Sequence, residues 1–251
     1  MNLQSLHSPE QRESRDALAL LSRAEYVLFD FDGPICKLFA RYPAARIARQ
    51  LKRACRADGV SLPQELARSS DPHGILWRLA GELSADQSLA RKAIGIAEST
   101  LATGELRAAR SAKRTPGAVQ LMHALHRQGR TLAIVSNNSS DAIDQYLRAH
   151  GLTSLFGEHV YGRLPEPEFM KPHPSCLLRA VGALEAWPGQ CVMIGDSRAD
   201  VQAAAAMKEA AGAPVGFIGY ARNKRKARVL REAGARALAG SMAELLGVFE
   251  A

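Results

Sequence analysis

The stretch Tyr26-Val-Leu-Phe-Asp-Phe-Asp-Gly-Pro-Ile-Cys36 places two acids, Asp30 and Asp32, directly after an apolar run. The run is short and continuous rather than alternating, which predicts a strand buried on both faces, as in a parallel sheet covered by helices. Burying a carboxylate without a partner costs several kcal/mol, so something must offset the charge of these two acids. The stretch therefore predicts both a central strand and a polar site at its carboxyl end.

The rest of the chain alternates between strand and helix patterns from residue 115 onward. Three further segments read as strands buried on both faces: Leu132–Val135, Cys191–Ile194 and Val215–Ile218. His159–Tyr161 is a weaker candidate, and Ala235–Leu238 is weaker still. Helices are predicted from Thr115-Pro116 to Gly129, from Ser140 or Asp141 to Gly151, and over Ala199–Ala211. Ser8 begins a capping-box-like start for a short helix ahead of the sheet. This alternation predicts an α/β fold with a doubly wound, Rossmann-like parallel sheet.

About 100 residues without a strand pattern separate the first two predicted strands. Three segments in this region read as helices: Pro43–Arg56, Pro72–Leu83 and Ala85–Arg107. The last contains Gly95 and Gly104, which favour a bend or a break. We therefore predict an inserted α-helical cap domain over residues 37–112, and an α/β core domain formed by residues 1–36 and 113–251.

Composition restricts the class of protein. Hydrophobic residues make up 47% and charged residues 23%, as in folded globular domains. No apolar run approaches the roughly 20 residues that span a bilayer, and the first residues lack the apolar core of a secretion signal. The four cysteines lie far apart, which fits a reduced interior better than disulfides or a zinc site. We expect a cytoplasmic protein without a membrane partner.

The net charge of +8 is concentrated in one segment. Between Arg41 and Arg114 there are 14 Lys or Arg against 7 Asp or Glu, whereas the remainder has 19 against 18. This pattern is typical of a solvated helical surface, and it also fits a lid that steers an anionic substrate. In the second reading, one of Arg41, Arg46 and Arg49 contacts a second anionic group of the substrate. Trp77 in the same segment is predicted to be core, with the substrate entrance as the alternative.

Polar side chains follow several of the predicted strands. Asp30 and Asp32 follow the first, Ser136 and Asn137 the second, and the segment Gly195-Asp196-Ser197-Arg198-Ala199-Asp200 follows Cys191–Ile194. Lys171 lies ahead of the helix that leads into this last strand. Ligands of open α/β sheets bind at the carboxyl ends of the strands, so we expect these groups to converge.

In this order the motifs resemble those of the haloacid dehalogenase superfamily. The four signatures are DFDGP at 30–34, SN at 136–137, Lys171-Pro172 and GDSRAD at 195–200. The helical insertion lies where the phosphoglycolate phosphatase-like subfamily carries its cap. One departure is Pro34, where the family commonly has Thr or Val. The resemblance implies a Mg²⁺-dependent phosphatase acting on a small phosphorylated metabolite, with phosphoglycolate as the obvious substrate.

The resemblance also implies a role for each acid. Asp30 is the expected nucleophile, which forms an aspartyl-phosphate, and Asp32 the expected proton donor and acceptor. Mg²⁺ would be bound by the carboxylates of Asp30 and Asp196 and by the backbone carbonyl of Asp32. Asp200 would hold a metal-bound water or orient the ligands.

The resemblance likewise implies which groups bind the phosphoryl oxygens. These are the ammonium of Lys171, the hydroxyl of Ser136 and the backbone N–H of Asn137.

Several alternatives stay open. Asp32 argues against halide displacement and phosphonate hydrolysis, but a sugar-phosphate mutase would keep the same residues. A non-catalytic phosphate-binding protein is the alternative from another class. The basic run between Arg222 and Arg231 could contact nucleic acid; we favour a solvated helix whose Val229 and Leu230 pack inward.

Overall fold

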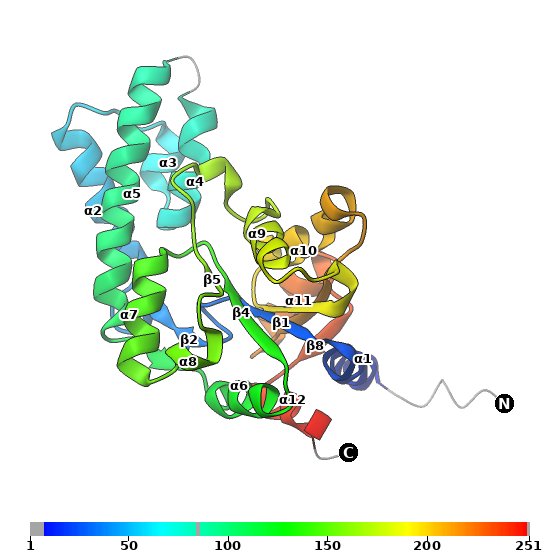
Figure 1. Ribbon diagram of the computed structural model, residues 1–251. Helices are drawn as coiled ribbons and strands as arrows, with labels where there is room; N and C mark the ends of the chain where they lie inside the picture. The colour runs from blue at the N-terminus through cyan, green and yellow to red at the C-terminus, as the bar shows by residue number, and fades with distance from the viewer. Residues whose placement is uncertain (1–7, 84–85, 250–251) are drawn as a thin grey trace.

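The computed structural model of the chain describes residues 8–83 and 86–249. Its centre is a sheet of six parallel strands in the order β5-β4-β1-β6-β7-β8 (Figure 1). The strands are β1 (Tyr26–Phe29), β4 (Thr131–Val135), β5 (Val160–Tyr161), β6 (Cys191–Gly195), β7 (Gly216–Tyr220) and β8 (Ala237–Ala239). The predicted doubly wound α/β fold is confirmed, and Tyr26–Phe29 forms the central β1.

Both faces of β1 are buried, as its continuous apolar run predicts. Val27 and Phe29 pack in the core on one face, while Leu28 packs in a second core on the other. Phe29 lies in register with Ile134 of β4 and Ile194 of β6. The carboxyl ends of these three strands therefore lie side by side, which brings the segments that follow them together.

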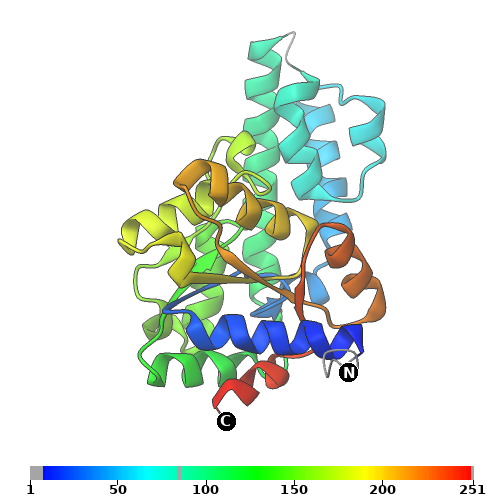
Figure 2. The ribbon, with the colours of Figure 1, turned by 90° about the vertical axis from the view of Figure 1, so that its right-hand side faces the viewer.

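Helices cover the two faces of the sheet. One face carries α1 (Pro9–Arg23), α6 (Ala118–Arg127), α7 (Ser140–His150), α8 (Thr153–Phe156) and α12 (Met242–Leu245), followed by the 3₁₀ segment η5 (Leu246–Phe249). The other carries α9 (Ser175–Ala183) and α10 (Arg198–Ala211), and α11 (Lys224–Glu232) packs with β7 and β8 in a smaller cluster. Short 3₁₀ turns η3 (Pro167–Phe169) and η4 (Pro188–Gln190) precede α9 and β6. Figure 2 shows α1 lying across the sheet on the side away from the helical insertion.

The helical insertion separates β1 from β4 and forms an upright bundle beside the carboxyl end of the sheet (Figures 1 and 2). It contains η2 (Leu38–Ala40), α2 (Ala44–Ala57), α3 (Gln64–Arg68), α4 (Pro72–Glu82) and α5 (Gln87–Ala109). The chain leaves through β2 (Cys36–Lys37) and returns through β3 (Lys113–Arg114), and these two strands pair antiparallel. The insertion has its own apolar core, including Ile47, Leu51, Leu76 and Leu101. The division into domains at 37 and 112 stays a prediction.

Two local expectations differ from the structure. The predicted break at Gly95 or Gly104 is wrong, because α5 is one uninterrupted helix, and a bend there stays a prediction. A Cβ at Gly104 would lie 2.7 Å from the Ile47 side chain, so this glycine allows α5 to pack closely on α2. The predicted start of this helix at Ala85 lies outside the described residues.

The second wrong expectation concerns Thr115, which does not cap a helix. Gly117, with φ of 80°, is the N-cap of α6. The Thr115 hydroxyl instead donates to the carbonyl of Gly33, at 2.6 Å. Other helix ends follow the sequence: Ser8 forms the predicted capping box, and Gly151 ends α7 in the left-handed conformation. Among the residues that the structure describes, no helix has the length and apolar character that a bilayer-spanning segment needs.

Candidate active site

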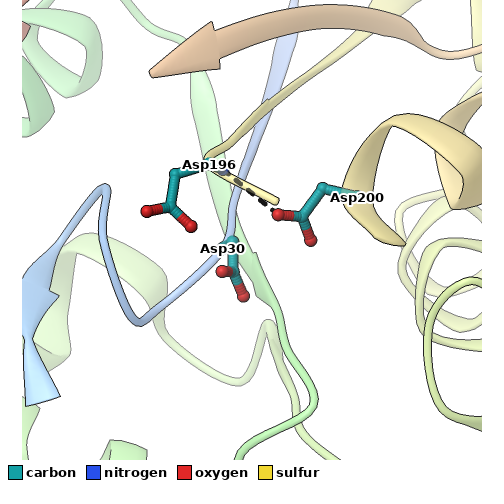
Figure 3. Close-up of side chains that lie close together, drawn as sticks. All are labelled: Asp30, Asp196 and Asp200. Atoms are coloured by element: carbon teal, nitrogen blue, oxygen red, sulfur yellow. Dashed lines mark hydrogen bonds between the residues drawn. The ribbon is translucent and has the colours of Figure 1, made fainter. Parts of the chain in front are cut away.

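Three buried acids converge at the carboxyl end of β1 and β6. Asp30, Asp196 and Asp200 each offer a carboxylate oxygen, and these oxygens all lie within 4.8 Å of one another. Figure 3 shows the three side chains facing a common space, Asp30 from the end of β1 and the others from the segment after β6. Gly33 makes room for the cluster, since a Cβ there would lie 2.5 Å from Cγ of Asp196.

The acid cluster has the composition of a site for a hard divalent cation. Carboxylate oxygens are the ligands that Mg²⁺ prefers, and three buried carboxylates this close repel one another. Oδ2 of Asp200 accepts hydrogen bonds from the backbone N–H of Asp196 and from the N–H and hydroxyl of Ser197. Its buried Oδ1 has the Lys171 ammonium 2.6 Å away. The donor set of three buried carboxylates fits a hard cation.

Lys171 reaches the acids from the loop before α9. Its ammonium lies 2.9 Å from Oδ1 of Asp30 and 2.6 Å from Oδ1 of Asp200, and it also donates to the Val135 carbonyl at 3.0 Å. Burial alone would lower the pKa of Lys171, but the charges of Asp200 and Asp30 outweigh it and raise that pKa. Lys171 therefore stays an ammonium inside the site.

The two carboxylate oxygens of Asp30 have different hydrogen-bond partners. Oδ1 accepts hydrogen bonds from the Lys171 ammonium and from the Ser136 hydroxyl, both at 2.9 Å, whereas Oδ2 accepts neither. Burial raises the pKa of Asp30 to about 7, although Lys171 opposes this shift. A cation bound in the cluster would favour the carboxylate further.

Asn137 ties the segment after β4 to the loop that carries Lys171. Its side-chain amide donates to the Lys171 carbonyl at 3.0 Å and accepts from the Lys171 N–H at 2.7 Å. The Ser136 hydroxyl lies 3.1 Å from Oδ1 of Asn138 and also accepts from the Asn138 N–H. The structure thus brings Ser136, Asn137 and Lys171 to the same place, as the strand-end rule predicts.

Asp32 lies at the edge of the cluster and is not one of its three members. Its Oδ1 accepts a hydrogen bond of 2.8 Å from the Leu38 N–H. Burial raises the pKa of Asp32 to about 6, against the lowering effect of that N–H. A carboxyl group with such a pKa can both give and take a proton near neutral pH.

Lys226 of α11 is a site residue that sequence reasoning missed. Its ammonium donates to Oδ2 of Asp196 at 2.6 Å and to the Asp196 carbonyl at 2.8 Å. Burial raises the pKa of Asp196, and Lys226 opposes this shift. The strand-end rule could have found Lys226, because it follows β7, the neighbour of β6. The expected packing of the same helix is present, with Leu230 buried and Val229 half-buried.

A second group of residues missed by sequence reasoning joins the insertion to the core. Glu105 of α5 is fully buried and accepts hydrogen bonds from the Asn138 amide at 2.8 Å and the Ser139 N–H at 3.1 Å. The Arg163 guanidinium and His73 Nε2 also contact its carboxylate. Burial would raise the pKa of Glu105, but His73 and Arg163 lower it to about 2. Nothing local in the sequence indicates this network, since its members are far apart along the chain.

A cavity of about 440 Å³ opens between the acids and the insertion. From the core it is lined mainly by the segments after β1, β4 and β6 and by Lys171; from the insertion it is lined by Phe39, Asp71, His73, Gly74 and Trp77. Trp77 is 44% exposed, so its predicted place in the core is wrong and the alternative at the entrance agrees with the structure. Arg41, Arg46 and Arg49, all within the described part of the chain, do not line this cavity.

Comparison with known proteins agrees with this fold. The sequence pattern of haloacid dehalogenase-like hydrolases matches residues 24–208. The chain therefore belongs to this family of hydrolases, and the resemblance inferred from its four motifs is confirmed.

Curated relatives match over part of the chain. Phosphoglycolate phosphatase from Aliivibrio fischeri is 36% identical over 36% of this chain and 39% of its own length. Phosphoglycolate phosphatase from Salmonella typhimurium is 32% identical over 47% of this chain and 44% of its own length. In both cases the chain spans less than half the length of the relative that it matches.

Solved structures match over almost the whole chain. A predicted phosphatase from Clostridium acetobutylicum has a TM-score of 0.63 at 19% identity, covering 90% of this chain and 98% of its own. A hydrolase of the same family from Deinococcus radiodurans, solved with bound phosphate and sodium, has a TM-score of 0.55 at 26% identity. It covers 91% of this chain and 96% of its own. The match to the Clostridium acetobutylicum phosphatase, at 19% identity, supports the fold alone.

Proposed function

We propose that the chain is a Mg²⁺-dependent phosphatase that hydrolyses a small phosphate monoester through an aspartyl-phosphate on Asp30. The observation that carries the proposal is the convergence of Asp30, Asp32, Asp196 and Lys171 on one cavity. The family match and the bound phosphate of the Deinococcus radiodurans hydrolase support it. The cysteines of the chain are free and buried, which supports a reducing compartment such as the cytoplasm.

In the proposed reaction, Asp30 is the nucleophile and Asp32 transfers the protons. Oδ2 of Asp30 attacks phosphorus, the ester P–O bond breaks, and Asp32 gives its proton to the departing alcohol. A water molecule then attacks the aspartyl-phosphate, Asp32 takes its proton, and Asp30 and inorganic phosphate are released. The pKa of about 6 supports both tasks of Asp32.

The phosphoryl group needs charge neutralisation and in-line positioning. The Lys171 ammonium, the Ser136 hydroxyl and the Asn137 backbone N–H are proposed to hold its oxygens. The carboxylates of Asp30 and Asp196 and the carbonyl of Asp32 would hold Mg²⁺, with Asp200 orienting the ligands. Bound there, Mg²⁺ supplies positive charge that stabilises the phosphoryl oxygens in the transition state.

We place this site between a core of residues 1–36 and 113–251 and a cap of residues 37–112. Opening and closing of such a cap would exchange substrate and product. The names of the curated relatives favour phosphoglycolate as one candidate substrate. Transfer of the phosphoryl group back to a second hydroxyl, as in a sugar-phosphate mutase, would use the same residues.

The test is turnover of an aryl phosphate by the purified chain. We expect activity with Mg²⁺, loss of activity in EDTA and recovery on adding Mg²⁺ back. Asp30→Asn should abolish turnover while circular dichroism and the unfolding midpoint stay near those of the wild type, because the amide is not a nucleophile. Turnover by this variant at near wild-type rates, or full activity in EDTA, would refute the proposal; isomerised sugar phosphate among the products would favour the mutase.

A further inference from the structure

The two ends of the cavity of about 440 Å³ carry different groups. The core end holds Lys171, which serves the proposed phosphoryl site. A substrate with a second anionic group, such as phosphoglycolate, would need another free cation at the end formed by the insertion. The charges of the residues at the end formed by the insertion therefore indicate which class of substrate the cavity can bind.

The insertion offers no free cation to this cavity from its described residues. Asp71 adds a negative charge, and Phe39 and Trp77 add aromatic surface. His73 is the basic side chain there, and its Nε2 lies 2.8 Å from the fully buried carboxylate of Glu105. The same carboxylate lies 3.0 Å from the Arg163 guanidinium, so His73 is held in a network with Glu105 and Arg163.

The arginines that make the insertion basic lie elsewhere. The Arg46 guanidinium lies 4.9 Å above the ring of Tyr42. Arg49 lines a separate cavity of about 350 Å³ with Lys52, Arg53 and Arg56. Among the described residues, no Arg or Lys between Arg41 and Arg114 lines the cavity of about 440 Å³. Lys37 lines a separate cavity of about 330 Å³ with Asp32 and Asp196.

Arg198 is the remaining cation of the cavity wall, and it belongs to the core. Its guanidinium lies 3.5 Å from Glu232, and both side chains are about half exposed to solvent. An exposed pair of this kind is weak, so Arg198 stays available as a cation on the core side of the cavity. Arg198 also lies at the start of α10, so it does not change the charge of the wall formed by the insertion.

The remaining groups at the end of the cavity formed by the insertion can bind the hydroxyl groups of a substrate. Trp77 is 44% exposed, and the flat face of an indole packs well against the C–H groups of a sugar or polyol. Oδ1 of Asp71 caps α4 by accepting from the His73 N–H at 3.1 Å, and the carboxylate has further lone pairs for hydroxyl groups. The Gln202 amide can both donate and accept. The cavity also has the size of small-molecule sites, which run from about 300 to 1,000 Å³.

We infer that the alcohol part of the substrate is neutral and polyhydroxylated, so that the ester is a sugar or polyol phosphate. This inference rests on the proposed phosphatase function and names its substrate class. Trp77 and Asp71 are its specificity-determining residues, and neither takes part in the cleavage of the ester bond.

The test compares kcat/KM for a hexose 6-phosphate, glycerol 3-phosphate and phosphoglycolate, with an aryl phosphate as reference. We expect the better of the two neutral-alcohol esters to exceed phosphoglycolate by at least about tenfold, the effect of one well-placed contact. A kcat/KM for phosphoglycolate that equals or exceeds both would overturn the inference and leave the phosphatase function standing. Failure to hydrolyse any ester, the aryl phosphate included, would remove the proposed function itself.

The chain offers a matched control, because its other tryptophan is remote from the cavity. Trp187 is 58% exposed and precedes η4. In Trp77→Ala we expect the preference for the neutral-alcohol ester over phosphoglycolate to fall about tenfold, mainly through KM. Trp187→Ala should keep the wild-type preference. Equal preferences in the two variants would contradict the role of Trp77.

A binding measurement tests the inferred substrate class without turnover. Trp187→Phe leaves Trp77 as the sole tryptophan, since the chain has two. We expect a free hexose, added with inorganic phosphate, to shift the emission of Trp77, and glycolate to leave it unchanged. A shift with glycolate alone would overturn the inference.

Discussion

The ammonium of Lys226 holds Asp196 by two of its oxygens at once, the carboxylate Oδ2 at 2.6 Å and the backbone carbonyl at 2.8 Å. This contact fixes the side chain of a proposed metal ligand and also places a positive charge beside it. The first effect favours cation binding and the second opposes it. Their magnitudes decide which one dominates.

We predict that Lys226→Met tightens the binding of Mg²⁺ by at least about tenfold. Two unit charges about 5 Å apart interact by about 3 kcal/mol at an effective dielectric constant of about 20, and more for a divalent ion. A hydrogen bond to a charged group contributes roughly 1.5 to 3 kcal/mol, so the removed repulsion outweighs the lost positioning. Isothermal titration calorimetry at pH 8 checks the prediction, because Asp30 and Asp32, with pKa values of about 7 and 6, are ionised there.

Lys226→Arg is the matched control, because it keeps the charge and should bind Mg²⁺ with near wild-type affinity. Weaker binding by Lys226→Met would mean that positioning of Asp196 is the larger effect, and the prediction would be wrong.

We predict that Asp32→Asn lowers kcat according to the leaving group. A general acid contributes about 10²- to 10⁴-fold, and mostly for alcohols that leave poorly without a proton. The loss should therefore be large for an alkyl phosphate and much smaller for a nitrophenyl phosphate, provided that formation of the aspartyl-phosphate limits the rate. Steady-state rates on both esters measure this. The same loss on both would speak against Asp32 as the proton donor.

We predict that Glu105 stabilises the fold in a pH-dependent way. Its pKa is about 2 in the folded protein, below the value of about 4.3 in an unfolded chain. The stabilisation is therefore present in full above about pH 4.3 and is lost as the pH falls toward 2; its size is on the order of 3 kcal/mol. Urea unfolding should show Glu105→Gln to be less stable than the wild type at pH 7, with a smaller difference at pH 3.

Glu98 supplies the control for Glu105. It also pairs with Arg163, at 2.8 Å, but its side chain is 29% exposed. Glu98→Gln should therefore cost clearly less free energy of unfolding at pH 7. If the two variants lose the same stability, burial of Glu105 is not the cause.

Much of the site could be predicted from the sequence because of one topological fact. Polar residues that follow neighbouring parallel strands must lie together, whatever the details of packing. Asp30, Ser136 and Asp196 follow β1, β4 and β6, which are adjacent in the sheet. Local patterns also predicted most helix ends, because caps depend on residues a few positions apart.

The expectations that proved wrong concern contacts between distant segments. Gly104 carries no sign in the sequence that it lies against Ile47, and Trp77 carries none that its helix faces the acids. Thr115 followed by proline reads as a cap, but its hydroxyl has a partner 82 positions away. In each case the local preference was overridden by how two elements pack.

The amino-acid order alone indicated the sheet, the insertion and the convergence of Asp30 and Asp196, because hydrophobic periodicity marks the strands and polar residues follow their ends. Lys171 joined them through the resemblance of the four motifs. Only the tertiary structure decided that Lys226 contacts Asp196, that Glu105 joins the insertion to the core, and that the arginines of the insertion lie outside the cavity. These contacts depend on the docking of one helix against another, and docking is set by side-chain packing over the whole interface, which no local pattern records.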